Sequence, residues 1–269
     1  MDKKIGFIGC GNMGKAMLGG ILKSGLTNPK NIFVSVSSHE SSLNLNKEFG
    51  VNSCCDNGFV CQNSDILILA VKPQLFKEIS SELSKEIKNS SIIVSVMAGI
   101  TLEALSYAFP NVSKIVRAMP NTPALCLEAM SAVAPNENVS KNELSEIIEI
   151  FNSFGKTEVV PEKLFDAVIG VSGSSPAYVF MFIEALADGA VLEGMPRDIA
   201  YKFASQAVLG SAKMVLETNA HPGELKDMVC SPSGTTIEAV KALEDGAFRA
   251  TVMDAVGKCC EKSRLMSRK

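Results

Sequence analysis

The sequence predicts an α/β fold in which a doubly wound sheet is followed by an all-helical domain. Strand and helix signals alternate from the N-terminus to about residue 160, as in a series of βαβ units. After Pro161 the strand signals stop and only helical patterns remain. We therefore expect two domains, at residues 1–160 and 161–269.

A glycine-rich turn near the N-terminus organises the first domain. Gly9, Gly11 and Gly14 follow a short apolar strand and occupy the three glycine positions of G-x-G-x-x-G. The first permits a sharp turn, the second lets a pyrophosphate approach the backbone, and the third lets the next helix pack closely. The pattern indicates a Rossmann-type dinucleotide-binding domain; the alternative is a tight turn that binds nothing. The expected cofactor contacts are Ile8, Gly9, Cys10, Gly11, Asn12 and Met13.

Strands and amphipathic helices alternate through the rest of this domain. The run Ile66–Val71 is apolar without alternation, which is typical of a strand in the middle of a parallel sheet. Further strands are predicted at 32–36, from residue 50, and at 91–97, 114–119, 130–134 and 157–160. Helices are predicted at 15–23, 41–49, 57–63, 74–87, 101–105 and 141–151.

One segment of the helical domain is apolar almost all round. Between Ala177 and Leu192 the only charges are Glu184 and Asp188, so every face of this helix needs cover. A small helical domain has little room to bury such a helix alone. We expect a second subunit to cover it, giving a homodimer through the helical domain; the alternative is a central helix surrounded by its own neighbours. Breaks between helices are predicted at 173–176, 194–196, 221–223 and 231–234.

Composition argues against several classes of protein. The net charge is −3 with both signs interspersed, and no basic run indicates nucleic-acid binding. The apolar run Ile66–Val71 is far too short to span a membrane, and the immediate first strand leaves no room for a signal peptide. The eight cysteines lack zinc-site spacing. We favour reduced thiols in a cytoplasmic protein over a metal shared by Cys54, Cys55 and Cys61.

The end of the second strand bears on the choice of nucleotide. NAD-specific sites usually place a carboxylate there to bind the ribose 2′-hydroxyl. This chain has no carboxylate there before Glu40, and the hydroxyls of Ser35 and Ser37 can donate to a 2′-phosphate. The sequence therefore favours NADP, with NAD as the alternative. Another interpretation is that the serines only cap the helix that follows.

Open α/β sheets bind ligands beyond the carboxyl ends of their strands. Small residues and prolines there suit a flat nicotinamide ring, and the expected contacts are Ala70, Val71, Lys72, Pro73, Met97, Ala98, Gly99, Pro120 and Asn121. In the helical domain, segment 231–236 precedes a helix, and its N–H groups and hydroxyls suit a substrate carboxylate. An ordinary Ser/Thr cap explains that segment equally well.

These segments together resemble the pyrroline-5-carboxylate reductases. The glycine turn, Ala70–Gln74, Arg117–Pro123, Gly173–Tyr178 and Leu225–Ile237 occur in that family's order and span nearly the whole chain. The M-P-N-T-P and S-P-x-G-x-T patterns are the specific ones. The resemblance implies reduction of 1-pyrroline-5-carboxylate to L-proline with NAD(P)H, the last step of proline synthesis. It also implies a helical dimerisation domain and higher oligomers such as decamers.

The resemblance also implies roles for individual residues. Thr236 hydrogen-bonds the nitrogen of the substrate ring, and Glu162 lies near the substrate. The loop before the helix completes a site that faces the partner subunit's nucleotide domain. The implied nucleotide-binding positions are Asn57, Lys72 and Pro73. The substrate carboxylate is implied to bind the backbone N–H groups of Ser233, Gly234, Thr235 and Thr236.

Two residues depart from the family pattern. Ser233 stands where the family usually has glycine, and a serine is strained there if the position needs a positive φ. Met228 stands where Asn or Gln is often found near the cofactor, so we expect one hydrogen bond to the nucleotide to be missing.

Two other functions stay open on sequence alone. An NAD(P)-dependent β-hydroxyacid dehydrogenase needs a Lys or His acid/base in the first long helix of the second domain, and residues 177–192 contain neither. A non-catalytic dinucleotide-binding regulator would not need both specific segments. Reduction of a protonated imine requires mainly proximity and electrostatic positioning, with Thr236 as the catalytic residue that orients the N–H. A chain with only two histidines is suited to that chemistry.

Overall fold

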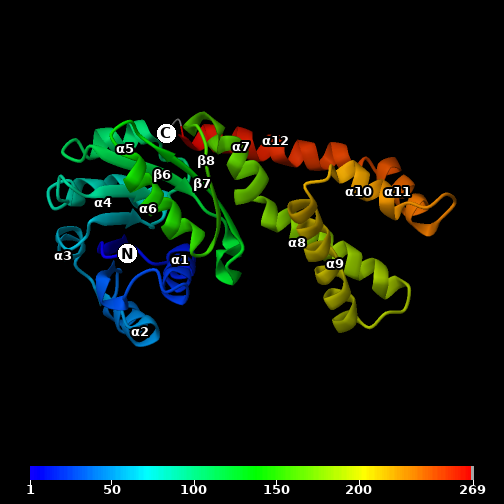
Figure 1. Ribbon diagram of the computed structural model, residues 1–269, viewed down its shortest axis with the longest axis horizontal. Coiled ribbons are helices and arrows are strands. Elements are labelled where there is room, and N and C mark those ends of the chain that lie inside the picture. The colour runs from blue at the N-terminus through cyan, green and yellow to red at the C-terminus, as the bar shows by residue number, and fades with distance from the viewer. Residues whose placement is uncertain (268–269) are drawn as a thin grey trace. The chain divides into compact units, whose positions relative to one another are not determined.

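The computed structural model describes residues 1–267, which form two compact units (Figure 1). Unit 1 contains Met1–Gly173 and the chain from Cys259 onward, and unit 2 contains Ser174–Lys258. Residues 161–173 and the end of the last helix thus group with the sheet. The two units differ in extent from the two predicted domains, whose boundary at residue 160 stays a prediction.

Unit 1 is built on an eight-stranded sheet in the order β3-β2-β1-β4-β5-β6-β7-β8. Neighbouring strands are parallel except β6 and β7, which pair antiparallel. Strand order reverses between β1 and β4, so the sheet is doubly wound and has its switch point there. The strands are β1 (Ile5–Ile8), β2 (Ile32–Ser35), β3 (Asn52–Cys54), β4 (Ile66–Leu69), β5 (Ile92–Ser95), β6 (Lys114–Met119), β7 (Ala129–Pro135) and β8 (Gly155–Val159).

Helices cover both faces of this sheet. One apolar core joins the sheet to α1 (Asn12–Lys23), α2 (His39–Phe49) and α6 (Lys141–Asn152). The core on the other face includes side chains of α3 (Asn57–Gln62), α4 (Phe76–Leu83) and α5 (Leu102–Ala108). In β4, Ile66 and Ile68 lie in the first core, and Leu67 and Leu69 lie in the second. A strand buried on both faces explains the apolar run that the sequence shows there.

Local signals decide where several elements begin and end. Helix α2 begins at His39, earlier than predicted, because the Ser38 hydroxyl accepts a hydrogen bond from the Ser41 N–H at 3.2 Å. Strand β3 begins at Asn52, later than predicted, because Gly50 ends α2 with φ 69. The predicted helix 74–87 is a 3₁₀ turn, Pro73–Leu75, followed by the shorter α4. The other 3₁₀ turns are Pro29–Asn31, Thr122–Cys126 and Glu162–Leu164.

The predicted break at 173–176 takes the form of a π-helical segment instead of a loop. Helix α7 (Phe165–Val168) continues into the π-helix Ile169–Gly173, and α8 (Ser175–Leu192) begins two residues later. Pro176 fits because the first turn of a helix does not use the N–H that proline lacks.

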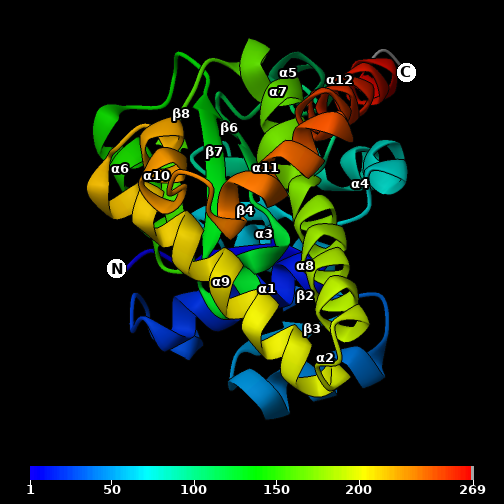
Figure 2. The same cartoon turned by 90° about the vertical axis from the view of Figure 1, so that its right-hand side faces the viewer.

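Unit 2 is entirely helical. It contains α8, α9 (Arg197–Thr218), α10 (Pro222–Val229), α11 (Thr235–Asp245) and the first part of α12 (Phe248–Ser267). Helices α8 and α9 pack on each other through a small core of Ala187, Ala200 and Ala204 (Figure 2). Within the described chain, Ala187 is the only buried residue of α8, while Phe180 is 63% and Met181 70% exposed. One chain therefore does not surround α8 with its own side chains.

The helical stretch Glu162–Leu192 is long and apolar enough to cross a membrane by length and composition, with a mean hydropathy of 1.3. The sequence alone showed no such segment, because polar residues interrupt every apolar run. Only 6% of the most apolar part is buried in one chain. Apolar exposure of this extent also marks surfaces that bind another protein subunit.

Candidate active site

The glycine turn after β1 has the geometry that each of its glycines allows. Gly9 has φ 79, and a Cβ added there would lie 2.5 Å from Cγ1 of Val71. A Cβ added at Gly11 would meet nothing within 4 Å, and no side chain caps helix α1, which Gly11 precedes. The turn therefore presents open backbone and the free N–H groups of a helix start, which suit a phosphate.

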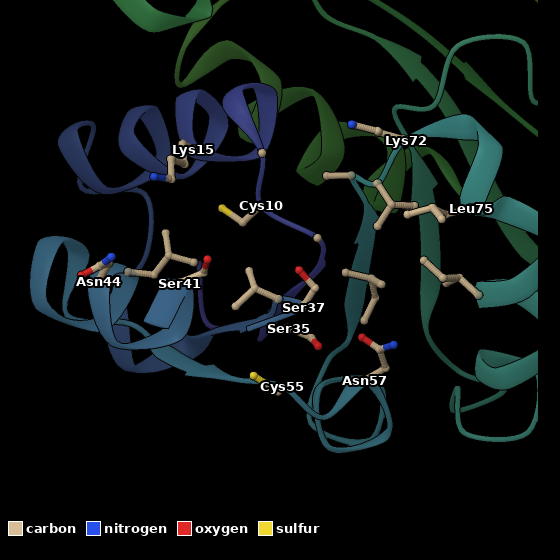
Figure 3. A pocket seen from close by; sticks show the side chains of 18 residues that line it. Cys10, Lys15, Ser35, Ser37, Ser41, Asn44, Cys55, Asn57, Lys72 and Leu75 are labelled. Carbon is tan, nitrogen blue, oxygen red and sulfur yellow. The ribbon is translucent and has the colours of Figure 1, made fainter. Parts of the chain in front are cut away.

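A cavity of about 590 Å³ lies at this turn (Figure 3). It is formed at the carboxyl ends of β1, β2 and β4, where the strand order reverses. Among the described residues that line it, none is acidic, and Lys15 and Lys72 are basic. The cavity is thus suited to a ligand rich in phosphate. It brings together these predicted residues: Ile8, Gly9, Cys10, Gly11, Ser35, Ser37, Asn57, Ala70, Val71 and Lys72.

The serines after β2 divide between two tasks. Ser38 caps α2, while Ser35 and Ser37 line the cavity. The Ser38 hydroxyl also donates to Oγ of Ser41 at 2.9 Å. The Ser41 hydroxyl lines the cavity and keeps its own hydrogen to donate. Capping therefore accounts for one serine and leaves three hydroxyls for a ligand.

Several cavity residues were missed by the sequence reasoning. Ser41, Asn44 and Leu45 lie three and four positions apart on α2, so they share the face of that helix toward the cavity. Lys15 comes from α1 and lies on the side of Ser41 and Asn44 in Figure 3. It supplies a cation that the segment after β2 lacks. The other missed residues are Val36, Cys55, Leu75 and Ile79.

Cys10 lies inside the glycine turn and lines the cavity. Burial raises the pKa of its thiol to about 12, against a smaller lowering by the charge of Lys15. At neutral pH the side chain is therefore an uncharged thiol, which places no negative charge beside a phosphate.

The remaining predicted cofactor residues lie outside the walls of this cavity. Asn12 and Met13 open α1, and Pro73 opens a 3₁₀ turn. Because β4, β5 and β6 are parallel neighbours, residues 97–99 and 120–121 follow strands that end at the same edge of the sheet. Asn121 Nδ2 donates to the Ser172 carbonyl at 3.0 Å, and its Oδ1 accepts from the Met130 N–H at 2.9 Å. The outlying residues are Asn12, Met13, Pro73, Met97, Ala98, Gly99, Pro120 and Asn121.

The loop before α11 has an open helix start. Gly234 is the N-cap residue and no side chain caps the helix, so an ordinary Ser/Thr cap is not formed. A Cβ at Gly234 would lie 2.3 Å from Oγ of Ser231 and 3.1 Å from its carbonyl oxygen, so glycine lets the loop pass close to Ser231. Ser233 has φ 57, so the strain expected for serine at this position is present. The first N–H groups of α11, at Thr235 and Thr236, have no capping side chain and suit a carboxylate.

Glu162 forms a partly buried ion pair in unit 1. Its Oε1 accepts from Nη1 of Arg117 at 2.9 Å and from the Leu102 N–H at 2.8 Å. Arg117 is only 5% exposed, and its guanidinium carbon lies 4.5 Å from the centre of the Phe165 ring. The carboxylate therefore compensates a buried cation, whatever else it contacts.

A doubly wound sheet whose glycine turn opens on a cavity at the switch point is the construction of NAD(P)-dependent oxidoreductases. Residues 162–266 match the family described as pyrroline-5-carboxylate reductase dimerisation, and residues 4–99 match NADP oxidoreductase, coenzyme F420-dependent. The pyrroline-5-carboxylate reductase of Escherichia coli (strain K12) is 54% identical over 268 residues, covering 100% of both chains.

Solved structures are similar over the same length. A pyrroline-5-carboxylate reductase from Coxiella burnetii has a TM-score of 0.92 at 32% identity, covering 100% of both chains. The Plasmodium falciparum pyrroline carboxylate reductase with NADP bound has a TM-score of 0.89 at 32% identity, covering 99% of this chain and 98% of that one. This chain belongs to the pyrroline-5-carboxylate reductase family.

Family membership decides between the functions that the sequence left open. The chain is an NAD(P)H-dependent oxidoreductase and a homo-oligomer. Neither the β-hydroxyacid dehydrogenase nor the non-catalytic regulator is favoured, because relatives matched over their full length are reductases of the pyrroline ring.

Proposed function

We propose that the cavity at the glycine turn holds the NADP(H) with which this protein reduces 1-pyrroline-5-carboxylate to L-proline, the last step of proline biosynthesis. The observation that carries this proposal is the open backbone at Gly11, which faces a cavity that has basic residues and hydroxyls but no acidic residue among the described residues of its walls. The NADP bound to the P. falciparum relative supports the choice of cofactor.

Residues of the cavity fit the adenosine and pyrophosphate half of the cofactor. The N–H groups at the start of α1 bind the pyrophosphate. The hydroxyl of Ser37, with the charge of Lys15, holds the 2′-phosphate, and Ser35 contacts the adenosine part of the nucleotide. Residues 97–99 and 120–121, at the same edge of the sheet, lie against the nicotinamide half. When bound, NADPH supplies the hydride.

The loop before α11 supplies contacts to the substrate. The uncapped N–H groups of Thr235 and Thr236 hold its carboxylate, and Ser233 and Gly234 line the same loop, where the Gly234 N–H donates to the Ser231 carbonyl at 3.0 Å. The hydroxyl of Thr236 orients the N–H of the ring, so it acts by positioning and not as a strong acid. Glu162 lies near the substrate while it keeps its bond to Arg117.

The assembly is a homodimer through the helical domain, from which a decamer is built. Exposed apolar side chains of α8 and α9 support this arrangement, since Phe180, Phe203 and Leu216 are each more than half exposed in one chain. The protein acts in the cytoplasm.

Loss of reduced-nicotinamide absorbance on adding 1-pyrroline-5-carboxylate tests the proposed function. NADPH and NADH are assayed in parallel with the purified protein. Rapid loss, faster with NADPH, is the expected result. No loss with either cofactor, from a protein that still binds NADPH, would contradict it.

A further inference from the structure

The amide of Asn57 is held in one orientation by a carboxylate outside the cavity. Asn57 opens α3 and lines the cavity, and its Nδ2 donates to both carboxylate oxygens of Glu82, at 3.1 and 3.3 Å. Glu82 lies on α4 and is not among the residues that line the cavity. Because an ionised carboxylate only accepts hydrogen bonds, the nitrogen of the amide must face Glu82.

The oxygen of the amide therefore faces the other way. In Figure 3 the Asn57 oxygen lies on the side of Ser35, and its nitrogen points away from that residue. A carbonyl oxygen accepts hydrogen bonds and repels other acceptors. It suits a hydroxyl or amino group of the nucleotide and does not suit a phosphate oxygen.

We propose that Glu82 is a positioning residue for cofactor binding, which makes Asn57 an acceptor for a hydroxyl or amino donor in the adenosine part of the nucleotide. The proposal rests on the proposed function, because it takes the cavity as the NADP(H) site. It places the phosphate-binding groups on the side of Lys15 and Ser41, and the donor-binding oxygen on the side of Ser35. Without Glu82 the amide can turn over and present its N–H₂ group instead.

Helix α3 and the turn after α4 carry a matched pair for comparison. One turn further along the chain, Glu86 accepts a hydrogen bond from Nε2 of Gln62 at 2.8 Å. Gln62 belongs to α3 like Asn57, but it is not among the residues lining the cavity. Glutamine can donate as well as accept, so Glu82→Gln and Glu86→Gln each remove a charge and an acceptor-only partner, and only the first loses control over the orientation of a cavity residue.

The test measures dissociation constants of NADPH by isothermal titration calorimetry on the full-length chain, which has no tryptophan for a fluorescence assay. We expect Glu82→Gln to weaken NADPH binding about three- to tenfold, the range of one hydrogen bond. The KM for NADPH should rise with it, while kcat and the melting temperature change little. Glu86→Gln should leave the dissociation constant unchanged or slightly lower.

The loss of charge alone predicts the opposite change in NADPH affinity. Removing a negative charge near the site of a phosphate-rich ligand strengthens its binding. Equal dissociation constants for Glu82→Gln and Glu86→Gln, or tighter binding by both, would overturn the proposal. This outcome is distinct from failure of the proposed function, in which the wild-type protein does not reduce 1-pyrroline-5-carboxylate.

A double-mutant cycle checks that Glu82 acts through Asn57. In an Asn57→Ala background, adding Glu82→Gln should change NADPH binding no further. An undiminished effect there would show that Glu82 acts by another route and would overturn the proposal.

A cofactor analogue that lacks the adenine amino group identifies the donor. If the donor is a ribose hydroxyl, Glu82→Gln weakens this analogue as much as NADPH; if it is the adenine amino group, the analogue binds both proteins alike.

Discussion

The guanidinium of Arg117 and the carboxylate of Glu162 meet at 2.9 Å, and they join β6 to the 3₁₀ turn after β8. The Arg117 side chain is 6% exposed and that of Glu162 is 30% exposed. Glu162 also accepts from the N–H of Leu102 at the start of α5. One carboxylate therefore connects three segments that are distant in sequence.

Glu162→Gln should destabilise unit 1. The change leaves the Arg117 charge buried without its counterion, which costs about 2 kcal/mol of unfolding free energy. Chemical denaturation measures this change in the free energy of unfolding. Glu217→Gln is the control, because Glu217 pairs with Lys213 on a surface where both side chains are 67% exposed, and such pairs contribute about 0–0.5 kcal/mol. Equal effects of the two substitutions would refute a structural role for Glu162.

Ser233→Gly should stabilise the protein. Serine at φ 57 is strained, and glycine adopts this conformation freely, so we expect a gain of about 0.5–1 kcal/mol. Thermal melting measures it, with the KM for 1-pyrroline-5-carboxylate as a check on the loop. Ser231→Gly is the matched control: φ of Ser231 is not positive, so only the flexibility of glycine is added and stability should fall. A lower melting temperature for Ser233→Gly would contradict the prediction that Ser233 is strained.

Thr236→Ala should mainly lower turnover. Losing a hydroxyl that orients the substrate N–H should reduce kcat about 10- to 100-fold and affect the KM less. Thr236→Ser keeps the hydroxyl and should retain most activity. Thr251→Ala is the control, since that hydroxyl in the first turn of α12 donates to the carbonyl of Ala247, the residue before the helix. Unchanged kinetics for Thr236→Ala would remove Thr236 from the mechanism.

Lys15→Ala should weaken NADPH more than NADH. If the ammonium group of Lys15 pairs with the 2′-phosphate, its loss should raise the KM for NADPH about fivefold, and added salt should narrow the difference from wild type. Lys23→Ala removes the same charge from the last turn of the same helix, away from the cavity residues, and should have little effect. An equal rise in the KM values for NADPH and NADH would indicate that Lys15 binds another part of the nucleotide.

Phe180→Glu should disrupt the dimer. Phe180 is 63% exposed on α8, and burial of a charge at a subunit interface is strongly unfavourable. Light scattering after gel filtration should show dimers or larger species for the wild type and monomers for the variant. Leu43→Glu, at a position 71% exposed on α2, should leave the assembly intact. A wild-type monomer that floats with lipid vesicles would support the membrane alternative for residues 162–192 instead.

Much of the sheet could be predicted because its signals are local. The apolar run of β4 and the glycine turn after β1 are visible within a few residues. The antiparallel return of β7 beside β6 is different, because pairing such as Ala118 with Val133 is decided by contacts distant in sequence. The 3₁₀ turn between them is followed by Leu127 at φ 65, a conformation that leucine does not signal.

The cavity shows the same division between local and non-local signals. Gly9, Ser35 and Val71 lie at the end of a strand or within two residues after it, so their place at the carboxyl edge follows from the fold class. Lys15 and Asn44 lie on helices, and only the packing of α1 and α2 on the sheet turns those side chains toward the ligand. Asn57 was found by resemblance, whereas its partner Glu82 has no sequence signal.

The last helix begins in unit 2 and ends in unit 1, where Oγ of Ser263 donates to Oδ1 of Asp166 at 2.6 Å. Unit 2 is thus an insertion within unit 1, and two peptide crossings connect the units. A protease that cuts once near residue 174 leaves the fragments joined through α12, and releasing unit 2 needs a second cut near residue 258. A gene truncated before residue 259 would likewise lack part of unit 1, so the sheet domain cannot be expressed intact as an N-terminal fragment.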